Sequence, residues 1–235
     1  LTALPLFAWM GEILFRTKLS ENLFKGLAPW MSRLPGGLIH VNVVGCALFA
    51  AISGSSAATV ATVGKMSIPE LRKRNYPEKL LLGSLAGSGT LGLLIPPSII
   101  LIIYGVTVQE SIAKLFIAGI IPGIMIAIFF MFYVIGWSVL NKDSMPKTEE
   151  TFSFSQKIKD SGQLIPVIVL IATVIGSIYV GIATATEAAS LGVVGALILS
   201  FFQKSLNKET FKLSLLGATK TSCMIAFILA GSSFL

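Results

Sequence analysis

The chain has 235 residues, of which 54% are hydrophobic and 12% are charged, and its mean hydropathy is +0.85. This composition excludes a soluble globular domain, and the repeated interruption of the apolar runs excludes a protein with a single membrane anchor. The formal net charge of +7 comes from basic residues between apolar runs, where they set membrane orientation rather than bind nucleic acid. We therefore expect an all-α polytopic membrane protein.

The first two segments predict a membrane helix followed by a surface helix. Leu1 to Phe15 is apolar and carries Glu12 near its end, where we favour a capping or pairing role for the carboxylate over a functional one. Residues 16–37 are amphipathic and basic, which suits a helix lying along the membrane surface. Because the chain begins and stops inside apolar runs, residues 1–235 are expected to be one membrane domain that is incomplete at both ends.

Residues 38–69 contain two short apolar segments separated by a serine-glycine stretch. As helices, Ile39 to Ile52 would be about 21 Å long and Ala57 to Ile68 about 18 Å long, whereas a bilayer core is about 30 Å thick. Neither segment crosses alone, and both flanks are basic, so we predict a re-entrant helical hairpin that enters and leaves on one side. The alternative is one kinked spanning helix from Ile39 to Ile68, whose length also fits.

The hairpin tip is expected near the bilayer centre. There the carbonyl end of the first half-helix suits a cation, and the open N–H end of the second suits a carboxylate. Ser53, Gly54, Ser55 and Ser56 are therefore candidate cation ligands. His40, the single histidine, lies near the hairpin entrance and is interpreted as an interfacial residue rather than a proton relay.

Residues 79–104 are apolar enough to enter a bilayer but are interrupted by a proline pair. The pair lacks the N–H groups that would bond the carbonyls of Gly92 and Leu93, so the helix is expected to stop near Gly92 and restart near Ser98. Broken backbone at membrane depth survives only where it faces protein or a watery cavity, which is typical of a cation site in a transporter. The candidate ligands in this discontinuous helix are Gly92, Leu93, Pro96 and Ser98.

The remaining segments divide the chain into two halves. Residues 113–140 predict a full span, and the polar residues 141–163 predict a solvated, cytoplasmic linker. Residues 164–182 predict the next span, and a basic loop at 203–212 precedes the last one.

Between those last two spans, a threonine-rich turn opens a helix. Thr184 or Thr186 is expected to cap this helix, with Glu187 in its first turn, and we favour capping over ion coordination.

The distribution of basic residues supports this topology. Lysines and arginines number four in residues 16–37, five in 65–79, four in 141–163 and three in 203–212, and the opposite side carries Lys114 alone. The positive-inside rule therefore predicts that the hairpin opens to the cytoplasm.

Four motifs stand out along the chain: ISGSSAAT at Ile52 to Thr59, LGLLIPPSI at Leu91 to Ile99, KLFIAGIIPG at Lys114 to Gly123 and TATEAA at Thr184 to Ala189. Together they resemble one family, the large membrane subunit of tripartite ATP-independent periplasmic (TRAP) transporters. The family commonly has proline where this chain has Ala185.

This resemblance implies an elevator-type transporter of the ion transporter superfamily with two inverted repeats, of which residues 1–140 are part of the first and residues 164–235 the start of the second. It implies a bacterial inner-membrane importer of organic acids, such as C4-dicarboxylates or sialic acid, that uses Na⁺ as coupling ion and no other cofactor. Its partners would be a periplasmic substrate-binding protein and a small four-helix membrane subunit. We expect the substrate carboxylate near Ser55, Ser56 and Thr59.

Two other classes of function remain as alternatives. An intramembrane enzyme would use Glu12, His40 or Glu187, yet the sequence has no HExxH or comparable cluster. An ion channel would need polar residues repeated along one helix face rather than a closed break in the backbone. We therefore expect no catalytic residues and no metal other than Na⁺.

Overall fold

The computed structural model describes residues 2–17, 19–146 and 153–232, and the regular elements within these ranges are all helical. The α-helices are α1 (Ala3–Phe15), α2 (Leu19–Met31), α3 (His40–Ser53), α4 (Ser56–Lys73), α5 (Glu78–Gly89), α6 (Ile99–Thr107), α7 (Ile112–Leu140), α8 (Phe154–Ser161), α9 (Ile165–Tyr179), α10 (Ala185–Phe202) and α11 (Lys208–Ser232). Three 3-10 turns are η1 (Gly37–Ile39), η2 (Thr90–Leu93) and η3 (Lys142–Ser144). The predicted all-α class is confirmed.

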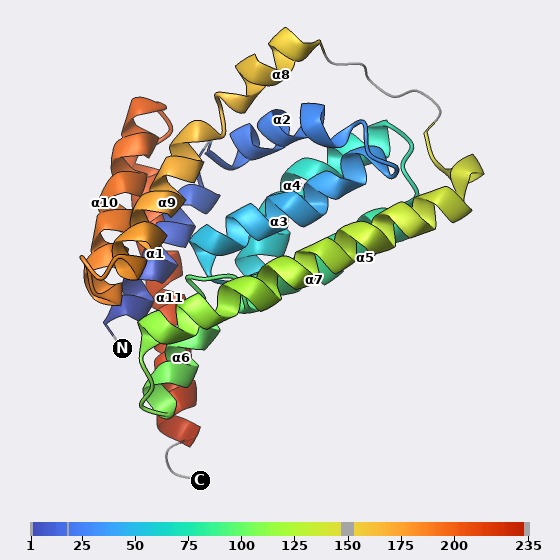
Figure 1. Cartoon of the computed structure of the whole chain (residues 1–235). Helices are drawn as coiled ribbons and strands as arrows, with labels where there is room; N and C mark the ends of the chain where they lie inside the picture. The colour runs from blue at the N-terminus through green and yellow to red at the C-terminus, as the bar shows by residue number, and fades with distance from the viewer. Residues whose placement is uncertain (1, 18, 147–152, 233–235) are drawn as a thin grey trace.

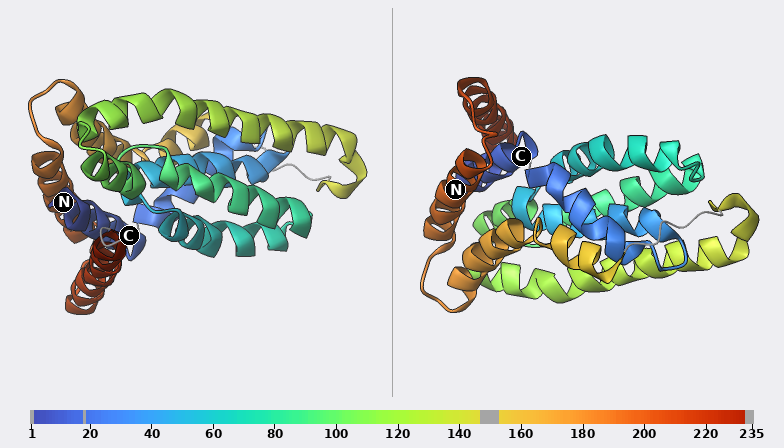
Figure 2. Two further views of the ribbon diagram at one scale, coloured as in Figure 1. Left: turned by 90° about the horizontal axis from the view of Figure 1, so that it is seen from below. Right: turned by 90° about the horizontal axis from the view of Figure 1, so that it is seen from above.

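Helix α3 is the centre of the larger of two helix groups. Eleven of its fourteen residues are buried, because α4, α5 and α7 run alongside it and α1 and α2 contact it as well. Figure 1 shows this group in blue to yellow-green. The second group surrounds α1, which packs against α10 and α11, while α9 packs on α10. In both views of Figure 2, α11 projects away from the first group.

Three helices of the described ranges are long and apolar enough to cross a membrane. They are Ile112–Leu140, Ala185–Phe202 and Lys208–Gly231. The outer face of α7 exposes large apolar side chains, with Ile121 76% and Phe132 63% accessible. Such a face is stable only against lipid or another apolar surface, which agrees with a membrane protein that has several spans.

The segment expected to be a solvated linker is partly helical and packed. Helix α8 lies on α2, where the indole N–H of Trp30 donates to the Ser161 hydroxyl at 2.7 Å. The ammonium of Lys157 lies 5.5 Å from the Trp30 ring centroid, a cation–π contact, and the side chain of Lys157 is buried. The linker is therefore packed on α2 at Lys157, while Gln156, Ile158 and Lys159 of α8 remain exposed; residues 147–152 lie outside the described ranges.

The last two helices, α10 and α11, each begin with a side-chain cap. At the start of α10, the Thr184 hydroxyl accepts from the Glu187 N–H at 3.3 Å and the Glu187 carboxylate accepts from the Thr184 N–H at 2.8 Å. This capping box confirms the expected role of both residues. Helix α11 begins at Lys208 rather than at Leu213, because the Asn207 side chain accepts from the Thr210 N–H at 2.6 Å and caps the helix early.

Candidate functional site

Helices α3 and α4 form an antiparallel pair joined at Gly54 and Ser55. A Cβ atom at Gly45 on α3 would lie 3.6 Å from Val63 on α4, which places the two helices side by side. Gly54 has a φ of +58°, the left-handed conformation that lets the chain reverse at the end of a helix. The alternative of one kinked helix from Ile39 to Ile68 is therefore wrong.

The hairpin tip is held by its own hydroxyl groups. The Thr59 hydroxyl donates to the Ser55 carbonyl at 2.8 Å and lies 2.9 Å from the Ser53 hydroxyl. The Ser55 hydroxyl caps α4 by accepting from the Ala58 N–H at 3.4 Å. The Ser56 hydroxyl oxygen is buried and has no hydrogen-bond partner among the described residues. A buried hydroxyl without a hydrogen-bond partner destabilises the fold, so the Ser56 oxygen is available to a ligand at the tip.

The discontinuous helix is broken as the proline pair predicts. Helix α5 ends at Gly89, η2 follows, and α6 starts at Ile99. One expectation is wrong: the Leu93 carbonyl is not free, because the Ser98 hydroxyl donates to it at 2.7 Å. For the Gly92 carbonyl, the described residues supply no such donor, since the N–H groups of Leu94 and Ile95 both bond the carbonyl of Leu91.

The hairpin tip and the helix break touch through their main chains. The Ile99 N–H donates to the Gly54 carbonyl at 3.1 Å. A Cβ atom at Gly54 would lie 2.6 Å from the Pro97 carbonyl oxygen, and one at Gly92 would lie 2.8 Å from the Ser56 nitrogen. Glycine at both positions therefore permits the two broken segments to meet.

The predicted cation ligands consequently fall into two groups. Gly54, Ser55 and Ser56 lie against Gly92 and Ser98, as a shared site requires. Leu93 and Pro96 lie to the side: Leu93 is 44% exposed, and Pro96 approaches Gly119 of α7. Of the predicted substrate ligands, Thr59 is buried and bonded within the tip, whereas Ser55 and Ser56 are partly exposed.

Helix α7 holds the outer side of the break. A Cβ atom at Gly119 would lie 2.7 Å from the Leu94 carbonyl oxygen, and one at Gly123 would lie 2.8 Å from the Ile95 side chain. These two glycines are one turn apart, so they form a recess on one face of α7 into which the broken segment fits. The break is thus packed between α7 and the hairpin tip.

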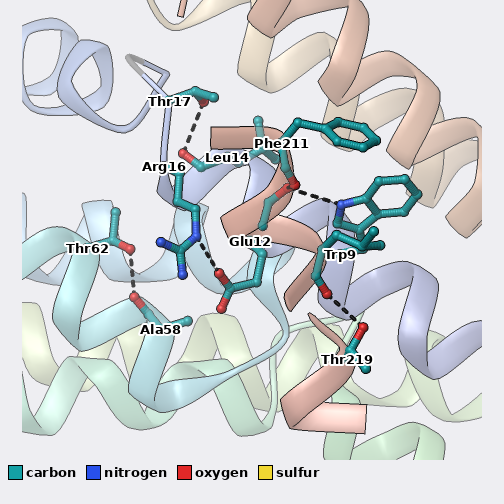
Figure 3. Close-up of polar contacts among 11 residues, drawn as sticks. Trp9, Glu12, Leu14, Arg16, Thr17, Ala58, Thr62, Phe211 and Thr219 are labelled. Carbon is teal, nitrogen blue, oxygen red and sulfur yellow. Dashed lines mark hydrogen bonds and ion pairs between the residues drawn. The ribbon is translucent and has the colours of Figure 1, made fainter. Parts of the chain in front are cut away.

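A carboxylate from α1 lies beside the hairpin tip, which the sequence did not indicate. Gly11 packs so closely on the tip that a Cβ atom would lie 2.8 Å from the Ser53 Cα. The next residue, Glu12, lines a cavity of about 30 Å³ together with Ser53, Ser55 and, from α11, Thr221. Figure 3 shows Glu12 facing Arg16, and the two form an ion pair at 2.9 Å, which is the pairing role that we expected.

His40 lies at the base of the hairpin, and its side chain is fully buried within the protein. Its Nε2 atom lies 2.8 Å from the Pro35 carbonyl oxygen. Glu12, His40 and Glu187 are bonded to different neighbours on different elements and do not form one constellation. In the described part of the chain, no group of three His, Cys, Asp or Glu side chains could hold a metal ion. The arrangement gives no support to the intramembrane-enzyme alternative.

Comparison with known proteins adds independent information. Residues 1–235 match the family model described as "Tripartite ATP-independent periplasmic transporter, DctM component". The chain is 33% identical over 98% of its length to the C4-dicarboxylate TRAP transporter large permease protein DctM of Rhodobacter capsulatus, covering 55% of that protein. It is 31% identical over its full length to the ectoine TRAP transporter large permease protein TeaC of Halomonas elongata, covering 55% of it. It is also 31% identical over its full length to the sialic acid TRAP transporter permease protein SiaT of Haemophilus influenzae, covering 38%.

These relatives are named as transporter permeases, which speaks against an enzyme. The chain spans about half the length of the first two. Because the family model covers every residue, this chain belongs to the DctM component family of the tripartite ATP-independent periplasmic transporters.

Proposed function

We propose that this chain forms part of the large membrane subunit of a secondary active importer of organic acids, driven by Na⁺. The observation that carries the proposal is the contact between the hairpin tip and the broken helix, through Gly54, Ser56 and Gly92. Interrupted helices whose broken ends meet are the usual construction of a cation site in secondary transporters, and here the Gly92 carbonyl is left without a donor among the described residues.

The residues at this contact fit a sodium ion. Na⁺ is a hard cation, and carbonyl and hydroxyl oxygens are suitable ligands for it. The Ser56 hydroxyl and the Gly92 carbonyl lack partners within the described structure, and the two residues are adjacent. Ser53 and Ser55 would supply further oxygens, and the site needs no carboxylate of its own.

The cargo is proposed to be a carboxylate-bearing acid. Relatives are named for C4-dicarboxylates and for sialic acid, which supports an organic acid as the substrate class. The N–H end of α4 at Ser55 and Ser56 would attract the carboxylate, because a helix N-terminus carries partial positive charge. Binding of the cation at the same tip would couple the two ligands electrostatically.

The transport movement, the membrane location and the partner proteins are proposed from family membership. We expect an elevator movement of an inverted-repeat protein in the bacterial inner membrane, with a re-entrant hairpin that opens to the cytoplasm. A periplasmic binding protein would deliver the acid, and a small four-helix subunit would brace the large one. The exposed apolar face of α7 would lie against lipid or this subunit.

The function is tested by uptake into proteoliposomes. The full-length protein with its small subunit is reconstituted, and uptake of labelled succinate and N-acetylneuraminate is measured with and without a Na⁺ gradient and the binding protein. Uptake that needs both is the expected result. A channel would equilibrate the acid without the gradient, and that result would overturn the proposal.

The hydroxyls of the tip supply the next prediction. Ser56→Ala removes a buried oxygen without a partner, and Ser55→Ala removes a cap and a candidate ligand. We expect each change to raise the Na⁺ concentration for half-maximal uptake by about fivefold to tenfold, the effect of one lost ligand bond to a charge. Sodium activation curves of the full-length variants measure this shift.

Ser190→Ala on the exposed side of α10 is the matched control, since its hydroxyl bonds only the Thr186 carbonyl. Unchanged sodium activation in both tip variants would contradict the proposed site.

A further inference from the structure

A second, larger cavity lies beside the site. It has a volume of about 610 Å³ and is bounded by the end of α1, by α2, by α4 and by the connection between α10 and α11. Its walls carry Arg16, Lys25, Lys65 and Lys204, against the single carboxylate of Glu70. We refer to this space as the basic cavity. Its size is in the range of cavities that hold small organic molecules.

The charge of the basic cavity is unbalanced. The Glu70 carboxylate is already paired with Arg74 at 2.6 Å, so it neutralises none of the lysines. No ion pair to Lys65 or Lys204 is found among the described residues, and both side chains are exposed. A concave surface lined by charges of one sign concentrates the opposite ion. The cavity therefore favours anions.

Apolar groups complete its walls. Phe15, Phe24 and Met66 line the same space as the lysines. This mixture suits an anion with a carbon skeleton better than an inorganic ion, because the skeleton gains from burial while the charged group meets the lysines.

The basic cavity and the hairpin tip share one ion pair. Arg16 lines the basic cavity, and its partner Glu12 lines the small cavity that also contains Ser53 and Ser55. Figure 3 shows this pair next to Ala58 and Thr62 of α4, the helix that runs from the tip towards Lys65. An anion that arrives in the basic cavity thus meets an arginine whose present partner, Glu12 of α1, lines the small cavity at the tip.

We propose that the basic cavity binds the carboxylate of the transported acid between the hairpin tip and the cytoplasm, with Arg16, Lys65 and Lys204 as its counter-ions. In this arrangement the acid competes with Glu12 for Arg16. The inference rests on the proposed function for the identity of the acid, but the affinity of the cavity for anions follows from its own charges.

The first test measures the potential in the cavity without transport. In a cysteine-free full-length background, Met66→Cys places a thiol in the cavity wall. Its reaction rates with a sulfonate-bearing and a trimethylammonium-bearing methanethiosulfonate are compared, each relative to free cysteine.

We expect the anionic reagent to be favoured, and Lys65→Gln or Lys204→Gln to lower that preference about twofold to threefold. Lys73→Gln, on the same helix and outside the cavity wall, is the matched control and should have a smaller effect.

The second test identifies the anion. Succinate and N-acetylneuraminate are expected to slow the labelling of Met66→Cys in phosphatidylcholine liposomes, and Glu12→Gln should strengthen this protection because it releases Arg16. A variant that only damaged the fold would weaken protection instead. Protection by inorganic phosphate or by phosphatidylglycerol alone, or no protection at all, would overturn the inference.

The two proposals fail separately. Sodium-dependent uptake without protection of the thiol would overturn the proposed anion site and leave the proposed transport function standing. Protection of the thiol without sodium-dependent uptake would support the anion site and overturn the proposed coupling to sodium.

Discussion

Gly92→Ala is expected to weaken the activation of uptake by Na⁺ strongly, while the protein remains folded and inserted. The new Cβ atom would lie 2.8 Å from the Ser56 nitrogen and 2.9 Å from the Ser55 carbonyl carbon. Both are main-chain atoms and cannot rotate away, so the tip must move from the break. Ligands of a site must keep their places within about 0.5 Å, and we expect an increase of about tenfold or more in the half-activating Na⁺ concentration.

The matched control is Gly83→Ala on α5, the helix that directly precedes η2. A Cβ atom at Gly83 would meet nothing within 4 Å, so alanine there adds a methyl group without displacing the backbone. Sodium activation curves of both variants in proteoliposomes measure the difference. Equal curves for Gly83→Ala and Gly92→Ala would show that the contact between tip and break plays no part in sodium coupling.

The second large effect is expected at Gly54, where alanine should lower both stability and uptake. Gly54 has a φ of +58°, and its Cβ atom would lie 2.6 Å from the Pro97 carbonyl oxygen. A left-handed conformation costs alanine about 1 kcal/mol, and displacement of the hydrogen bond from the Ile99 N–H to the Gly54 carbonyl costs about 1 kcal/mol more. The midpoint of thermal unfolding of the full-length protein in detergent measures the sum.

Gly181→Ala separates these two contributions. Gly181 also has a left-handed φ, of +76°, but a Cβ atom there would meet nothing within 4 Å. It should therefore show the conformational cost alone, with a fall in midpoint about half as large as that of Gly54→Ala. A fall of the same size in both variants would mean that the packing of the tip on Pro97 contributes nothing.

The parts of the structure that the sequence predicted are those with a local cause. The proline pair removes two N–H donors, and the helix is interrupted there. The serine-glycine stretch ends α3 at a left-handed Gly54, and Thr184 with Glu187 forms a capping box. Each of these outcomes depends on atoms within a few residues, so the order of residues was sufficient.

The parts that it missed depend on contacts between distant segments. Glu12 lies beside Ser55 because Gly11 allows α1 to approach the tip, and no pattern within residues 1–15 indicates that approach. Similarly, the polar residues of α8 predict a solvated linker and give no sign of the contact with Trp30 on α2. The Leu93 carbonyl was expected to be free because the reach of the Ser98 hydroxyl across the break depends on the path of the loop.

The hydrogen bond from the Ile99 N–H to the Gly54 carbonyl has a consequence for how this protein can vary. Because donor and acceptor both belong to the peptide backbone, replacing the serine side chains of the tip leaves this hydrogen bond in place. The serines of the turn could thus be exchanged to suit another ion or another cargo while the two interrupted helices stay registered with each other. The hydrogen bond would be broken by proline at position 99, which has no amide hydrogen, or displaced by a side chain at Gly54, whose Cβ atom would meet the Pro97 carbonyl oxygen.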